Sequence, residues 1–130
     1  MDKFTGVIIE ESLEDKDVLK DLNIIKTKVE LVTDKHKTPW IKQWSLHTVE
    51  IPEDKIDGIA EKVSKSLDIQ HNWFADFKNE TTHYIIFRNK VFKIDRTQKV
   101  QYDQATAYGL TLGIPDYQLD FSPDIKQWER

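Results

Sequence analysis

The sequence of 130 residues contains no cysteine. Disulfides, thiolate metal ligands and cysteine nucleophiles are therefore excluded, and a reducing compartment is favoured. Long hydrophobic runs are also missing, since no window approaches the roughly 18 apolar residues of a membrane span. We therefore expect a cytoplasmic protein with no membrane partner.

Glycine is scarce, and the four glycines stand apart from one another. No GxGxxG or GxxxxGK[ST] motif is present, so a glycine-rich loop that cradles phosphate is not expected. The GxSxG and HExxH patterns are absent too, and the four histidines are dispersed. The sequence predicts no metal site, no cofactor and no catalytic residue that a motif would identify.

The net charge is small, at −4, and charges of both signs alternate along the chain. This balance gives no general attraction to nucleic acid or to an anionic membrane. The length suits one hydrophobic core. We expect one domain over residues 1–130, a monomer or small homo-oligomer, in which 116–130 is a short strand or an ordered tail.

The apolar periodicity changes several times along the chain. From residue 24 to 31 it alternates, as in a half-buried strand, whereas from 56 to 67 it recurs at helical spacing. Gly113 and Pro115 mark the end of a last helix. The fold class predicted is α+β, with a mainly antiparallel sheet of about five to six strands and the helices packed on one side. The expected strands are 3–9, 24–31, 44–51, 73–77, 83–88 and 91–95; the expected helices are a short one over 12–22 and two long ones over 56–67 and 98–112.

Two stretches carry a resemblance. WFADFKNETTHYIIFRNKVFKIDR, followed by AYGLTLGIPDYQLDF, resembles small conserved hypothetical proteins of unknown function that have no family name. The similarity covers most of the chain and favours a complete, stand-alone protein. It implies no activity and no functional residue.

One face of the sheet is the first candidate site. With a two-residue turn at Asn89-Lys90, the flanking strands pair so that one face is apolar, and is the core, while the other is mixed. With 78–82 as the preceding turn, Asp76 joins the mixed face beside Tyr84. A one-residue slip in that turn would move Asp76 to the opposite face. The ligand-binding candidates on the mixed face are Asp76, Tyr84, Arg88, Lys93 and Asp95.

Three interpretations of this mixed face are open. Its carboxylates, phenol and cations favour a non-catalytic module that binds a polar small molecule or a protein partner. Alternatively, the face is simply solvated. The enzymatic alternative is a small hydrolase or transferase that uses Asp76 or Asp95 with a histidine as acid and base. A histidine qualifies only if the fold gives it a charged partner. The pairs to look for join His47 or His83 to Glu50, Asp76 or Arg88.

The loop 35–44 is the second candidate site. Its lysines can neutralise phosphates and its tryptophans, Trp40 and Trp44, can stack on bases, which is the chemistry of single-stranded nucleic-acid binding. The acidic net charge makes nucleic acid the less favoured partner. The same tryptophans can instead pack into the core or contact a protein.

Overall fold

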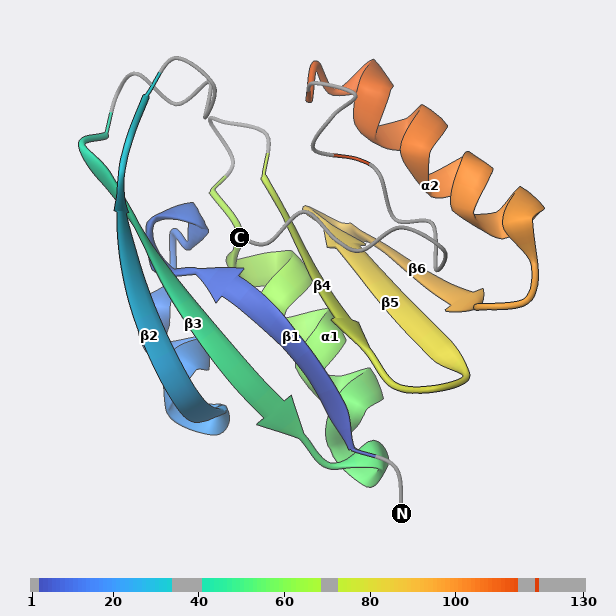
Figure 1. Cartoon of the computed structure of the whole chain (residues 1–130), viewed down its shortest axis with the longest axis horizontal. Coiled ribbons are helices and arrows are strands. Elements are labelled where there is room, and N and C mark those ends of the chain that lie inside the picture. Colours follow the sequence, from blue (N-terminus) through green and yellow to red (C-terminus); the bar gives the residue numbers. More distant parts are fainter. Residues whose placement is uncertain (1–2, 34–40, 69–72, 115–118, 120–130) are drawn as a thin grey trace.

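The computed structural model describes residues 3–33, 41–68, 73–114 and 119, and within these ranges six antiparallel strands form one sheet. Their order across the sheet is β2-β3-β1-β4-β5-β6 (Figure 1). The predicted α+β class and antiparallel sheet are therefore confirmed. The strands are β1 (Phe4–Ile9), β2 (Asn23–Leu31), β3 (Gln43–Ile51), β4 (Phe74–Lys78), β5 (Thr82–Phe87) and β6 (Lys90–Asp95).

The two long helices are α1 (Ile56–Ser66) and α2 (Lys99–Thr111). The apolar residues that predicted α1 are all buried, and α2 ends before Gly113, whose φ of 87° is typical of a glycine that stops a helix. The helix expected over 12–22 is wrong in type, because short 3₁₀ turns take its place. These turns are η1 (Glu10–Ser12) and η2 (Lys16–Asp21), and a third, η4 (Glu53–Lys55), precedes α1.

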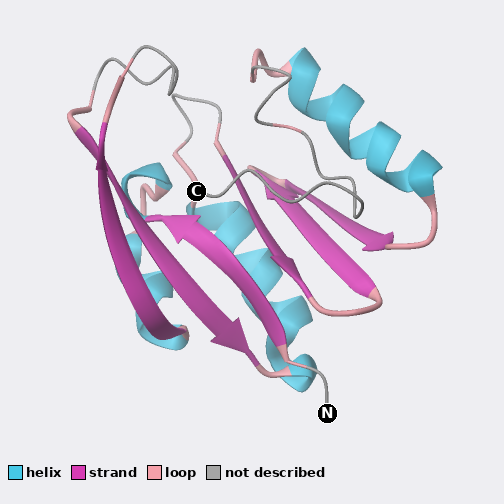
Figure 2. Ribbon diagram, in the orientation of Figure 1, coloured by secondary structure: helices cyan, strands magenta, loops and turns pink. Residues whose placement is uncertain are grey.

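The long helices lie on opposite faces of the sheet: α1 is drawn behind it in the ribbon view (Figure 2), and α2 packs on the other face, against β5 and β6. The expectation that all helices pack on one side is therefore wrong. The physical reason lies in β5, where Tyr84 and Ile86 pack toward α1 while Ile85 and Phe87 pack toward α2. A strand that is apolar on both faces requires a cover on each of them.

The turn between β4 and β5 differs from the predicted one by one residue. The Asn79 side-chain oxygen accepts hydrogen bonds from the backbone N–H of Thr81, at 3.0 Å, and of Thr82, at 2.8 Å. This Asx-type turn makes Asp76 pair with Ile85 instead of the residue before it. Asp76 therefore lies on the face that α2 covers, and it does not join Tyr84 and Asp95 on the mixed face.

The turn between β5 and β6 is Arg88-Asn89, one residue earlier than predicted, and Asn89 adopts the positive φ of 60°. The Ser64 hydroxyl of α1 donates to the Phe87 carbonyl oxygen at 2.6 Å and accepts from the Lys90 N–H at 3.1 Å. These bonds fix the pair Phe87 and Lys90 at the turn. Because the strands shift by two residues relative to the prediction, each side chain keeps its predicted face.

Beyond α2, the predicted strand or tail over 116–130 lies outside the described residues except for Leu119. That side chain is buried against α2, and its carbonyl oxygen accepts a hydrogen bond from Thr106 at 3.2 Å.

Gly6 allows β1 to lie between β3 and β4. It pairs with Val49 on one side and Phe77 on the other. A Cβ at this position would lie 2.0 Å from the Asp76 carbonyl oxygen and 2.8 Å from Phe77 Cα. Both obstacles are backbone atoms, so the neighbouring strand would have to move.

Gly6→Ala should therefore lower the free energy of unfolding by about 3 kcal/mol or more, because the overlap cannot be relieved by a side-chain rotation. Gly58→Ala is the matched control, since a Cβ there meets nothing within 4 Å on α1. It should stabilise the protein by about 0.5–1 kcal/mol through helix propensity. Urea unfolding measures both, and equal effects of the two substitutions would contradict the close approach at Gly6.

Candidate functional site

The predicted mixed face is covered by α1. Tyr84 is only 2% exposed, its ring packs edge-on to Phe4 at 5.3 Å, and its hydroxyl donates a hydrogen bond to Asp57 of α1. Lys93 is exposed beside this phenol, with its ammonium 5.7 Å from the ring centroid. The Tyr84 ring, expected on a ligand-binding face, is therefore part of the core between the sheet and α1.

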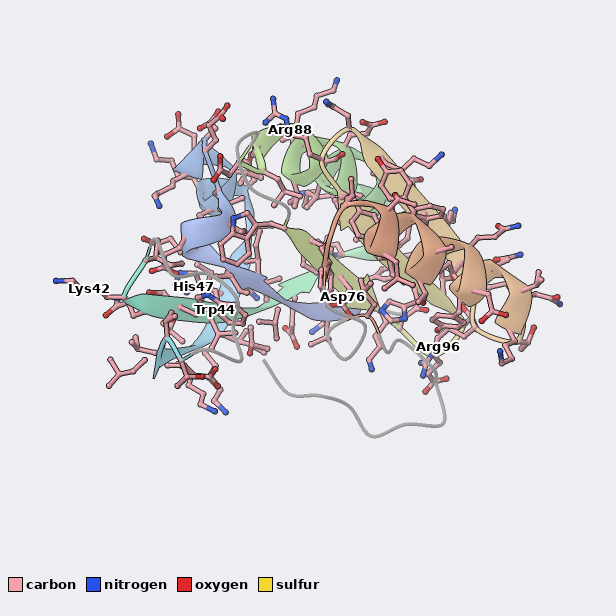
Figure 3. The ribbon with its side chains drawn as sticks, turned by 90° about the horizontal axis from the view of Figure 1, so that it is seen from above. Lys42, Trp44, His47, Asp76, Arg88 and Arg96 are labelled. Atoms are coloured by element: carbon pink, nitrogen blue, oxygen red, sulfur yellow. The ribbon has the colours of Figure 1, made fainter. Side chains whose placement is uncertain are left out.

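Arg88 and Asp95 stabilise local structure near the strand ends. The Arg88 guanidinium donates to the carbonyl oxygens of Lys65 and Leu67, where α1 ends, and lies 3.7 Å from Glu14. Asp95 accepts hydrogen bonds from the N–H and the hydroxyl of Thr97, which lower the pKa of its carboxyl group. In Figure 3, Arg88 is seen beside α1, well away from Asp76.

Asp76 forms a buried hydrogen-bonded chain with His83 and Tyr102. Asp76 Oδ2 lies 2.9 Å from His83 Nε2, and His83 Nδ1 lies 3.1 Å from the Tyr102 hydroxyl. The three side chains are 8%, 3% and 4% exposed, and they join β4 and β5 to α2. Burial raises the pKa of the Tyr102 phenol, against the opposing effect of a hydrogen bond with Arg96, so the phenol keeps its proton at neutral pH. The condition set for His83, a carboxylate partner, is met.

His47 belongs to a second polar cluster, on the α1 side of the sheet. Its Nδ1 lies 2.8 Å from the Thr27 hydroxyl oxygen on β2, and its Nε2 lies 2.9 Å from Glu10 Oε1 in η1. Ser45, two residues before His47, donates from its backbone N–H and its hydroxyl to Glu11. These bonds fasten both β2 and η1 to β3. Sequence reasoning missed Glu10 and Thr27, because no local pattern marks a pair so distant along the chain.

Trp44 is only 2% exposed and packs against Trp73, with ring centroids 5.7 Å apart. A buried indole offers no face on which a base can stack. Trp44 therefore packs into the core. Trp40 and the lysines at 35 and 37 lie outside the described residues.

The edge strand β2 exposes most of its apolar side chains. The strand was expected to be half-buried, but it lies at the edge of the sheet and, among the described strands, pairs only with β3. Six large apolar side chains are exposed among the described residues, and four of them lie on β2. Their exposed fractions are 38% for Ile24, 52% for Ile25, 54% for Val29 and 75% for Leu31.

The part of the chain that the structure describes contains no group of three histidine, aspartate or glutamate side chains that could hold a metal ion. In the same residues, no helix has the length and apolar character to cross a membrane.

The sequence matches no protein-family model, no curated protein and no solved structure. Function therefore has to be inferred from the geometry of the chain itself.

Asp76→Ala tests the buried chain. The change leaves a buried imidazole nitrogen without this acceptor, and should lower the free energy of unfolding by about 2–3 kcal/mol. Lys78→Ala, on an exposed side chain of the same strand, should change it by less than about 0.5 kcal/mol. Denaturant unfolding provides the measurement. Equal values for the two variants would show that Asp76 and His83 are not coupled in the folded protein.

The pH dependence of stability tests the burial of Tyr84. Burial first, and then the hydrogen bond to Asp57, raise the pKa of the phenol above its ordinary value of 10.0. The unfolded chain therefore releases this proton first, and stability should fall as the pH rises above 10. Tyr84→Phe removes this contribution, so its slope should be shallower by up to about 1.4 kcal/mol per pH unit. Tyr108→Phe, at a partly exposed tyrosine, is the control. If Tyr84→Phe leaves the slope of stability against pH unchanged, the burial of Tyr84 is contradicted.

Proposed function

We propose that this protein is a non-catalytic interaction module that binds an extended protein segment along the outer edge of β2. The observation that carries the proposal is the concentration of exposed apolar side chains on this one edge strand. An added strand would satisfy the outer backbone N–H and C=O groups of β2 and cover those side chains.

The opposite edge of the sheet is less suited to this role. β6 is six residues long, against nine for β2, and its apolar residues Phe92 and Ile94 pack against α2. Ile94 is only 1% exposed. The apolar surface of β6 is thus already used within the chain, whereas that of β2 is not.

The polar cluster at His47 prepares β2 for binding. Thr27, at the centre of the strand, is held by His47, which is held in turn by Glu10. A strand fixed in this way loses little conformational freedom when a partner pairs with it, and that raises affinity.

A second function is supported by the pair of Asp76 and His83. A carboxylate in contact with an imidazole, and a phenol on the other ring nitrogen, is the arrangement of an acid–base relay. The hydrolase or transferase alternative is carried by this contact alone. The Asp76→Ala variant separates the two functions, because it leaves β2 intact and should retain binding at that strand.

The experiment for the first function uses random peptides displayed on phage, selected against the immobilised protein. Amide chemical shifts of the labelled protein with a selected synthetic peptide should change along β2 and not along β6. Leu31→Lys should weaken binding by about tenfold or more, since burial of a leucine contributes roughly 1.5–3 kcal/mol. Leu110→Lys, an equally drastic change at an exposed leucine of α2, should leave the affinity unchanged. Failure to select any peptide against protein that sediments as a monomer, or binding that is insensitive to Leu31→Lys, would contradict the proposal.

A further inference from the structure

We infer that the partner of β2 is a second copy of this chain, paired antiparallel about a two-fold axis through Val29. The inference rests on the proposed function, since it assumes that β2 accepts a strand, and it specifies which strand. The pattern of charges and apolar residues within β2 selects both the partner and the register.

In this register each residue i faces residue 58 − i of the other copy. The numbers of two paired residues always differ by an even amount, so paired side chains lie on the same face of the sheet. The backbone groups that point outward on one copy then meet those that point outward on the other. The contact is therefore isologous, with the same surface used by both copies. The two sheets would join into one continuous sheet across the axis.

Charge complementarity favours Val29 as the centre. Lys28 then faces Glu30 of the partner subunit, and Glu30 faces the partner's Lys28, so two opposite-charge pairs flank the axis. Within one chain, Lys28 Nζ already lies 3.3 Å from Glu30 Oε2. Among registers centred on residues 25 to 30, no other places opposite charges across the strands without also placing two like charges face to face.

The apolar residues follow the same symmetry. Val29 meets its own copy on the axis, and Leu31 lies across from Thr27 on the same face. Val29 and Leu31 are 54% and 75% exposed in the single chain, so both copies remove apolar surface from water.

Irregularity at the start of β2 limits the contact. The pairing of β2 with β3 shifts between Ile24 and Lys26, and a bulge of this kind twists an edge away from further pairing. Within β2, the register about Val29 pairs residues 27–31 of the two copies, and these residues follow the irregular end. Two-fold pairing also uses both β2 edges, leaving the β6 edges outside, so assembly stops at a dimer.

The absence of cysteine makes a direct test available. Val29→Cys places two thiols opposite each other at the axis, within the 4.4–6.8 Å Cα separation that a disulfide tolerates, by the usual spacing of about 4.5–5.5 Å between paired strands. Mild oxidation should therefore give a covalent dimer. Thr27→Cys is the matched control on the same strand face, and its two thiols would lie four residues out of register, too far apart to join.

Charge reversal tests the register independently. Lys28→Glu alone and Glu30→Lys alone each place like charges across the axis, and each should sediment as a monomer at a concentration where the original protein is a dimer. A mixture of the two variants restores both opposite-charge pairs and should form a heterodimer. Each substitution also removes the ion pair between Lys28 and Glu30 within one chain, which would lower the stability of that variant. Mixing the two variants would not restore this pair.

Sedimentation equilibrium from low micromolar to near millimolar protein reads out the mass, and circular dichroism confirms that each variant is folded. A monomer at every concentration, or cross-linking of Thr27→Cys in preference to Val29→Cys, would overturn the inference. Selected peptides that still bind along β2 in that case would leave the proposed function standing with another partner. Loss of both dimer and peptide binding would overturn both.

Discussion

The burial of β5 on both faces is the constraint on which the rest of the structure depends. Ile85, Ile86 and Phe87 are fully buried in succession, so a helix is needed on each side of the sheet. The same constraint buries His83, which lies on the face toward α2. A buried imidazole has to find hydrogen-bond partners, and Asp76 and Tyr102 provide them. The most enzyme-like contact in the molecule is thus also one that the packing of β5 requires.

The elements themselves could be predicted from the sequence because their signals are local. The spacing of apolar residues located α1, and Gly113 located the end of α2. The position of Asp76 could not be predicted in the same way, since it depends on the number of residues in one turn. The Asn79 side chain decides that number, and the rival turn was equally compatible with the hydrophobic pattern. A difference of one residue in this turn moves the Asp76 carboxylate from the face covered by α1 to the face covered by α2.

The candidate sites depended on strand order, which the sequence does not reveal. The alternation along β2 predicted a strand but did not tell that the strand is at the edge, and so its exposure was missed. Tyr84 and Lys93 read as a polar surface because each is amphipathic, and only the position of α1 shows that the phenol is buried. The partnership of His83 with Asp76 was recognisable as a possibility, whereas His47 with Glu10 joins elements whose proximity no local signal indicates.

The central position of β1 has a consequence for how the chain folds. Thr5 pairs with Lys78, and β1 also pairs with β3, so both neighbours of this strand are synthesised after it. The hairpins of β4, β5 and β6 need only short loops, but the insertion of β1 closes a loop of about seventy residues, and such distant pairings are slow. On the ribosome, one side of β1 has no strand to pair with until β4 has emerged. The two halves of the sheet therefore become one structure only after residue 78 has left the ribosome.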